Sequence, residues 1–233
     1  MKNRFLAFTE ICVLIIALGC MKSGSISVEE QLFKRTVRRL DKMFRYYNRV
    51  PIEKENVEQA PTPFMINLEK RIDFVRKTQE EWKCLIDSFQ HVIHYDSSSK
   101  WADDALFCIC IEYLILNNYD GTGTFTQRAE ESVKRIEESF SQGGIEEWTK
   151  NNMPNFWPNY ARSFGGLLRK ENEWNNIKYS LQLNVANSLI SEGKYRRATD
   201  YLRQAVKKCP NTEFEDYTKE IIEITEKHLE QQK

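Results

Sequence analysis

The chain has 233 residues, of which 41% are hydrophobic and 29% charged, and its 34 basic side chains balance its 34 acidic ones. This balance leaves no net positive field, so sequence-independent binding of nucleic acid is not expected. A mean hydropathy of −0.60 excludes a protein that crosses a membrane many times. Only 9 glycines and 6 prolines occur, about half the usual share, which disfavours hairpin-rich β folds and favours a helical globule.

Residues 1–19 have the pattern of a secretory signal peptide. A short basic start precedes an uninterrupted apolar run over 11–19, which is too short for a bilayer span of about 20 residues. The run ends in the sequence ALGC, which resembles the lipobox of bacterial lipoproteins, with the small Gly19 before the cysteine. The resemblance implies cleavage after residue 19, acylation of Cys20 and a lipidated tether over 20–27. An ordinary signal peptide and an internal helix remain the alternatives.

The next segment, residues 28–63, is expected to contain a helix and then a linker. Apolar residues alternate at spacings of four and three, which predicts one buried stripe on a helix over 28–48. The stripe consists of Phe33, Val37, Leu40, Phe44 and Tyr47. Basic residues crowd the other sides of this helix, so that face either meets anionic headgroups near the anchor or is simply solvated. They are Lys34, Arg35, Arg38, Arg39, Lys42 and Arg45. Three prolines within 50–63 indicate an extended linker.

Residues 64–142 carry helical patterns throughout. Between residues 65 and 93, apolar side chains recur about every 3.5 positions. This spacing predicts either one long rod or two helices broken near Thr78. A strongly apolar helix is expected over 100–117, and an amphipathic helix over 124–142.

The C-terminal part of the chain begins with an irregular, aromatic-rich segment over 143–173. We expect a short helix and a loop there, packed on the helices around it. The aromatic residues are Trp148, Phe156, Trp157, Tyr160 and Phe164. Three further helices are predicted over 174–192, 195–208 and 214–231, and no segment predicts a strand.

Seven small, aromatic and turn-forming residues near the C-terminus follow an informative spacing. They are Ala186, Gly193, Tyr195, Ala198, Leu202, Ala205 and Pro210. The spacing resembles a tetratricopeptide repeat, a helix–turn–helix unit of about 34 residues, over 179–212. Small residues let the paired helices approach closely, and Gly193 permits the turn. The resemblance implies an all-α, tetratricopeptide-repeat-type helical solenoid of antiparallel helix pairs, with the repeat and a capping helix over 174–233.

A second resemblance covers residues 89–113. The stretch FQHVIHYDSSSKWADDALF resembles the inter-repeat junction of the outer-membrane assembly lipoprotein family BamD, also called YfiO. In that family an aromatic–aliphatic helix end, a Tyr-Pro-x-Ser turn and an Ala-Asp-Asp-Ala helix start recur. Asp96 stands here in place of the usual proline. The resemblance implies a BamD-like domain in an outer-membrane lipoprotein that faces the periplasm, and Met21 after the cysteine is consistent with outer-membrane delivery.

Motifs for catalysis or metal binding are weak. His91 and His94 lie three apart with no third ligand at a suitable spacing, so no metal site is predicted. Asp103 and Asp104 start a helix, where carboxylates favour the helix dipole and are not opposed as an acid–base pair. Cys108 and Cys110 point to different sides of a helix, and burial is the simplest reading for both. A disulfide is possible in an oxidising compartment, but its pairing cannot be read from the sequence.

The sequence therefore predicts a non-catalytic, membrane-anchored protein–protein interaction scaffold of the bacterial cell envelope. No cofactor is expected, and the partners would be envelope proteins or extended peptides, including β-barrel assembly components if the BamD resemblance holds. One alternative is an envelope enzyme or enzyme subunit whose aromatic segment 148–164 stacks on glycan. Another is a purely structural spacer built from the rod over 65–93.

Two kinds of site residue follow from this prediction. Cys20 would carry the lipid. A polar stripe on the first helix of the repeat would hydrogen-bond to the backbone of a partner, because the first helices of such repeats line the concave surface. The stripe consists of Ser180, Asn184, Asn187 and Ser191. A merely solvated stripe remains the alternative.

Overall fold

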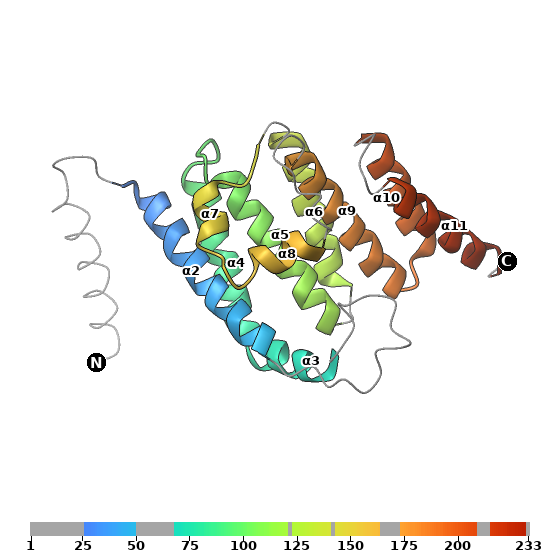
Figure 1. Cartoon of the computed structure of the whole chain (residues 1–233), viewed down its shortest axis with the longest axis horizontal. Coiled ribbons are helices and arrows are strands. Elements are labelled where there is room, and N and C mark those ends of the chain that lie inside the picture. The colour runs from blue at the N-terminus through green and yellow to red at the C-terminus, as the bar shows by residue number, and fades with distance from the viewer. Residues whose placement is uncertain are drawn as a thin grey trace.

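The computed structural model describes residues 26–49, 68–120, 123–140, 143–163, 173–208 and 215–231. Within these ranges the chain is all-α, with ten helices and no strand (Figure 1). The prediction of an all-α fold is therefore confirmed. The predicted signal peptide, Cys20, most of the predicted tether and the predicted linker 50–63 lie outside the described residues.

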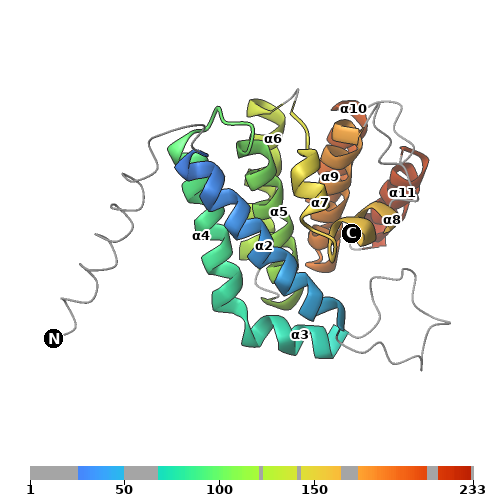
Figure 2. The ribbon, with the colours of Figure 1, turned by 60° about the vertical axis from the view of Figure 1, so that its left-hand side comes forward.

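Three helices form the N-terminal end of the fold. Helix α2 (Val28–Arg49) buries the predicted apolar stripe and packs on α4 (Gln79–Tyr95), while α3 (Leu68–Lys77) turns away from α4 at their junction (Figure 2). The junction is Thr78, whose side chain accepts a hydrogen bond from Trp82 Nε1 at 3.1 Å and donates one to the Phe74 carbonyl at 2.8 Å. Of the two expectations for residues 65–93, two helices broken near Thr78 is therefore the correct one.

The remaining long helices pack on one another in chain order. They are α5 (Ala102–Asp120), α6 (Thr124–Ser139), α9 (Glu173–Ser191), α10 (Tyr195–Lys208) and α11 (Glu215–Gln231). Contacts join α4 to α5, α5 to α6, α6 to α9, α9 to α10 and α10 to α11. Figure 1 shows the result as a row of helices with α2 at one end and α11 at the other.

The core lies around α5 and α9, which contact each other as well as their neighbours in the row. In α5, every side chain from Ala102 to Leu114 is buried, and α9 is buried on nearly all sides from Asn176 to Leu189. A helix that is buried around most of its circumference is surrounded by other elements. Both helices consequently hold polar side chains inside the protein, and these side chains determine how the neighbouring segments pack.

The turn between α9 and α10 lies where the sequence pattern predicts it. Gly193 has a φ of +72°, which L side chains rarely adopt, and the Lys194 and Gly193 amides donate to the Leu189 and Ile190 carbonyls, each at 2.9 Å. The predicted span of α10 agrees with the structure, and α9 differs by one residue at each end. A small cluster then joins these helices to α11, through Tyr179, Leu183, Ala186, Leu202 and Ala205 with Ile221 and Ile222 against them.

Candidate functional site

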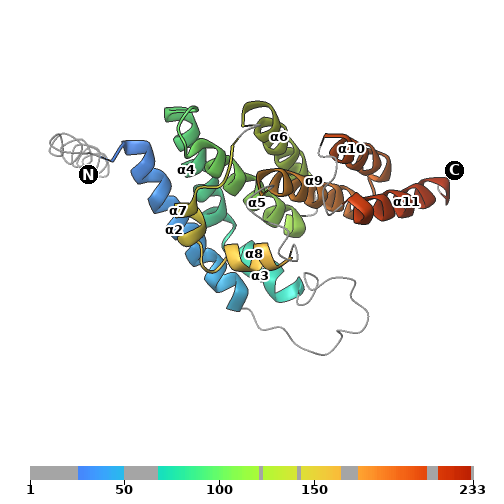
Figure 3. The same cartoon turned by 45° about the horizontal axis from the view of Figure 1, so that its top comes forward.

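The irregular segment 143–163 lies across one face of the row of helices. It contains two short helices, α7 (Glu147–Asn151) and α8 (Trp157–Ser163), which pass over α2 and α5 toward α9 (Figures 1 and 3). Polar contacts attach the segment at several points, and aromatic contacts fill the space beneath it. The segment therefore determines which surfaces of α2, α5 and α9 a partner could reach.

Two adjacent aspartates at the start of α5 hold the beginning of this segment. The carboxylate of Asp104 accepts hydrogen bonds from the Glu146 amide, at 3.1 Å and 3.3 Å, and from the Thr149 hydroxyl. Asp103 Oδ2 accepts from the Gly144 amide at 2.9 Å. Burial raises the pKa of both carboxyl groups, and the hydrogen bonds from Thr149 and Gly144 oppose that rise.

Gly143 fits this junction because it has no Cβ. A Cβ atom at residue 143 would lie 2.6 Å from Asp103 Oδ2, a distance shorter than real contacts of Cβ atoms in proteins. The sequence assigned Asp103 and Asp104 only a favourable place near the helix dipole. The structure adds a tertiary role, which is to bind the backbone of a segment about 40 residues away in the chain.

The second half of the segment is held by α2. Asp41 is 6% exposed and accepts hydrogen bonds from the backbone amide of Asn155 at 2.7 Å and from its side-chain amide at 2.6 Å. The Asn48 side chain in turn donates to the Asn155 carbonyl. The half-buried Asn155 thus links two parts of the chain that are far apart in sequence.

The aromatic side chains of the segment belong to the core. Phe156 and Tyr160 are each 8% exposed, and the Phe156 ring lies 4.5 Å from that of Phe44 while the Tyr160 ring lies 5.6 Å from that of Phe107. Trp148 is half-buried, and the cationic groups of Lys34 and Arg38 lie 5.1 Å and 5.8 Å from the centre of its ring. Phe156 and Tyr160 are therefore not exposed for stacking on glycan, whereas Trp157 is half-buried and Phe164 lies outside the described residues. The alternative of an enzyme with a glycan-stacking aromatic segment stays a prediction.

The polar stripe of α9 is only partly at the surface. Ser180 is fully buried, with its hydroxyl bonded to that of Tyr160. Asn184 is half-buried and donates to the Ser180 carbonyl at 2.8 Å, whereas Asn187 and Ser191 are exposed. The prediction that all four residues face a partner is therefore wrong for Ser180, because α8 covers it. Sequence periodicity placed the four residues on one face but could not show what packs against that face.

A polar groove lies on the opposite side of α9. It has a volume of about 680 Å³ and runs between α6 and α10. Seven charged residues line it: Glu130, Glu131, Lys134, Glu137, Glu138, Lys178 and Arg197. Gln127, Gln182, Tyr201 and Gln204 complete the lining. None of these residues was singled out from the sequence, since they come from three helices and share no motif.

An ion pair and a hydrogen bond connect the three helices that line the groove. Arg197 on α10 lies 2.6 Å from the carboxylate of Glu130 on α6, and the side-chain amide of the buried Gln182 donates to Glu137. Burial raises the pKa of Glu130, and the guanidinium of Arg197 opposes that rise. The pKa of Tyr201 is also raised, chiefly by burial. The groove therefore presents both positive and negative groups, with amides and a neutral phenol between them.

Other candidate residues remain separate from one another. Asp87, Gln90, His91 and His94 line a shallow depression on the outer side of α4, and the described residues contain no group of three or more His, Cys, Asp or Glu that could hold a metal ion. Cys84 is exposed, while Cys108 and Cys110 are buried, and burial raises the pKa of both buried thiols. Cys209 lies outside the described residues.

One buried polar residue was missed by the sequence reasoning. Glu112 in α5 is fully buried, and neither oxygen of its carboxyl group has a hydrogen-bond partner. Burial raises its pKa well above the ordinary value. The uninterrupted apolar run around it, from Leu106 to Leu116, was a signal that a central helix would enclose this position.

Comparisons of the chain with known proteins give no match. It matches no family model, no curated protein and no solved structure. Among the described helices, none is both long enough and apolar enough to cross a membrane.

Proposed function

We propose that the protein is a non-catalytic, membrane-anchored protein–protein interaction scaffold of the bacterial cell envelope. The observation that carries this proposal is the row of long helices, in which each helix packs on the next one in the chain. Rows of stacked helices form extended surfaces to which other proteins can bind. The lipobox-like sequence around Cys20 supports attachment to a membrane, in our proposal the outer membrane, with the helices facing the periplasm.

In this proposal the row is a tetratricopeptide-repeat-type solenoid with a BamD-like region around 89–113. Support comes from the helix pair α9–α10, where Ala186 and Ala198 are fully buried and Gly193 takes the left-handed conformation at the turn. Further support comes from the pair α5–α6. The ADDA sequence forms the first turn of α5, and the contact between the two helices is the most extensive one among the described helices. A role alongside β-barrel assembly components remains an extension of the BamD resemblance.

The groove between α6 and α10 is our candidate for the partner surface. Segment 143–163 already covers much of the face formed by α2, α5 and α9, including Ser180. The groove lies on the other side of α9 and is open. Its mixed charges suit an extended segment of an envelope protein that itself carries both acidic and basic side chains, because opposite charges can then pair along its length.

Site-specific photocrosslinking in native membranes tests this assignment. A photoreactive phenylalanine would replace Gln204, which is exposed and lines the groove, or Asn187, which is exposed on the polar stripe. Glu223, exposed on α11, serves as the matched control position. We expect a discrete protein adduct from residue 204 and none from residue 223. An adduct from residue 187 alone would indicate that the partner binds at the polar stripe of α9 and not at the groove.

A charge reversal then shows whether the groove itself recognises the partner. Lys134 is exposed and lines the groove, whereas Lys207 is exposed on α10 and does not line it. Lys134→Glu should weaken the adduct from residue 204, and Lys207→Glu should leave it unchanged. If no position gives an adduct, or if purified protein releases product from peptidoglycan, the scaffold proposal is wrong.

A further inference from the structure

The outward face of α2 is uniformly basic. Five cationic side chains recur there at spacings of three, one, three and three, which places them on one side of the helix, opposite the buried stripe. They are Arg35, Arg38, Arg39, Lys42 and Arg45, and all five are exposed. Spread over eleven residues, they cover about 15 Å of helix. We refer to these five residues as the α2 basic face.

No acidic side chain neutralises this face within the described part of the chain. Two acids of α2 are engaged elsewhere, since Glu30 pairs with Lys34 at 2.6 Å and Asp41 binds Asn155. Some exposed basic residues on other helices have carboxylate partners, among them Arg203 with Glu226 and Lys219 with Glu215. In a chain whose charges balance overall, five unneutralised cations on one helix face are therefore a local concentration of positive charge.

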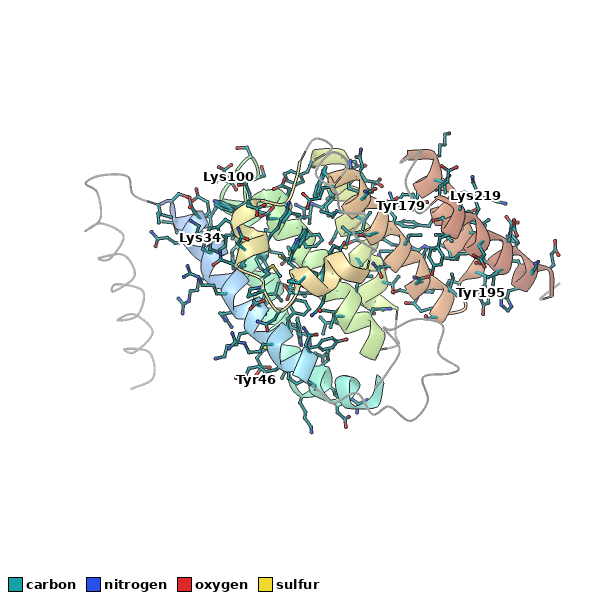
Figure 4. All side chains as sticks on the ribbon, in the orientation of Figure 1. Lys34, Tyr46, Lys100, Tyr179, Tyr195 and Lys219 are labelled. Atoms are coloured by element: carbon teal, nitrogen blue, oxygen red, sulfur yellow. The ribbon has the colours of Figure 1, made fainter. Side chains whose placement is uncertain are left out.

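Exposed apolar surface accompanies the charge. Val28 is 59% exposed and Tyr46 47% exposed, and their separation of eighteen residues, five helical turns, puts them on one line along α2. Figure 4 labels Tyr46 and Lys34 toward the two ends of α2, with further nitrogen-tipped side chains on its outer side. An exposed tyrosine and valine beside cations provide apolar area that a membrane interface can bury while the charges meet the headgroups.

We infer that the α2 basic face lies against an anionic lipid surface. Helix α2 is the outermost helix at its end of the row (Figure 1), so a planar surface can meet it without displacing another helix. Lipid phosphates would neutralise the five cations, and Tyr46 and Val28 would enter the headgroup region. The contact would orient the row of helices relative to the membrane. It does not require acylation of Cys20, although an anchor eight residues before Val28 would hold this face near the bilayer.

Lipid fits the face better than nucleic acid does. The cations follow one helix at the end of the row (Figure 1), whereas the groove between α6 and α10 and the depression on α4 lie on other helices. A nucleic-acid backbone gains nothing from an exposed valine, whereas a membrane interface buries it. Binding of nucleic acid in place of lipid is therefore treated as an outcome that would contradict the inference.

Vesicle sedimentation of the full chain carrying Cys20→Ala tests the inference without a lipid anchor or a protein partner. The measured quantity is the ratio of binding to phosphatidylcholine vesicles containing phosphatidylglycerol over binding to pure phosphatidylcholine vesicles. This ratio removes any contribution that the apolar residues 1–19 make irrespective of lipid charge. It also separates failure of this inference from failure of the proposed scaffold function.

Two variants with the same change in net charge locate the contact. Arg35→Gln/Arg39→Gln/Lys42→Gln removes three cations from the α2 basic face and leaves Arg38, which lies over the Trp148 ring. The matched control is Arg135→Gln/Arg196→Gln/Lys227→Gln, three exposed residues on α6, α10 and α11. Each basic residue near an anionic surface contributes about fivefold to binding, so the first variant should lose on the order of 100-fold. The control should lose much less.

Three further measurements sharpen the result. Tyr46→Ser should weaken vesicle binding with no change in charge, because the tyrosine no longer enters the interface. Raising salt to about 1 M should abolish the preference for anionic vesicles, since the Debye length falls to about 3 Å. Circular dichroism melts should be the same for all variants, because the substituted side chains are exposed. Equal losses in the two triple variants, no preference for anionic lipid, or displacement from vesicles by duplex DNA would overturn the inference.

Discussion

The carboxyl group of Glu112 lies in the core with no hydrogen-bond partner for either oxygen. A buried polar group without a partner destabilises a fold, and a buried charge destabilises it much more, so the group keeps its proton when the chain is folded. Its folded pKa is raised above the unfolded value near 4.5. With respect to Glu112, the free energy of unfolding is therefore highest below the unfolded pKa. It declines as the pH rises from the unfolded pKa through the folded pKa.

Glu112→Met should stabilise the protein. Methionine is similar in size and has no group that requires a hydrogen bond, so we expect a gain of about 1–3 kcal/mol at pH 5. The gain should increase toward pH 8, because only the wild type has the Glu112 carboxyl group, whose ionisation lowers the free energy of unfolding as the pH rises. Urea unfolding of both proteins at the two pH values measures the difference between their free energies of unfolding. The other buried carboxyl groups are present in both proteins, so their effects cancel in this difference. Glu220→Met, at an exposed position of α11, should change stability by under about 0.5 kcal/mol. A destabilised Glu112→Met would mean that the carboxyl group has a stabilising partner.

Ala198 tests the close approach of α9 and α10. It is fully buried in the core between these helices, so Ala198→Phe should overpack the contact and lower the free energy of unfolding by about 1–3 kcal/mol or more. Thermal unfolding followed by circular dichroism would detect this change. Asp200→Phe, at an exposed position on the same helix, is the control. Similar melting temperatures for Ala198→Phe and the wild type would argue against the tight helix pair.

At the scale of elements, segment 143–163 covers one face of the row of helices and is held there by tertiary contacts. Its two short helices contain 5 and 7 residues, lengths that are not stable as isolated helices in water. The segment is ordered by Asp103 and Asp104 at its start, by Asp41 in its middle and by aromatic contacts with α2 and α5. Its conformation therefore depends on the helices beneath it more than on its own sequence.

Asp104→Ala should loosen this segment selectively. The substitution leaves the Glu146 amide and the Thr149 hydroxyl without their acceptor in a buried environment, at a cost of about 1–3 kcal/mol. Hydrogen exchange should accelerate over residues 145–163 more than in α10, which does not touch Asp104. Asp96→Ala removes only the exposed turn contacts to Ser98 and provides the comparison. Uniform acceleration along the whole chain would show that Asp104 supports global stability and has no specific docking role.

At the scale of the whole molecule, the proposed attachment to a membrane depends on Cys20. Cys20→Ala removes the only sulfur that a lipobox enzyme could acylate at this position, so the protein should lose its acyl mass and its firm association with membranes. Intact-mass analysis and membrane fractionation in high salt measure both effects. High salt matters because the α2 basic face would retain some protein at low ionic strength. Unchanged mass and unchanged fractionation would rule out the lipoprotein proposal.

The sequence was a good guide to the helices and a poor guide to the candidate sites. Apolar periodicity predicted α2 and α10 closely, and the missing apolar step near Thr78 allowed for the break between α3 and α4. These features depend on neighbours three and four residues apart, which the sequence displays directly. The same periodicity grouped Ser180 with Asn187, but one is buried and the other exposed.

By itself, the sequence determined the all-α class, most helix boundaries and the left-handed turn at Gly193, because local spacing and backbone preference control these features. Only the tertiary structure decided that segment 143–163 covers Ser180, that α6 and α10 enclose a polar groove, and that five cations of α2 stay unneutralised in the described chain. Each of these depends on residues from separate helices, whose relative positions are set by packing of the whole core. Burial and exposure are properties of that packing, and a single helix pattern does not contain them.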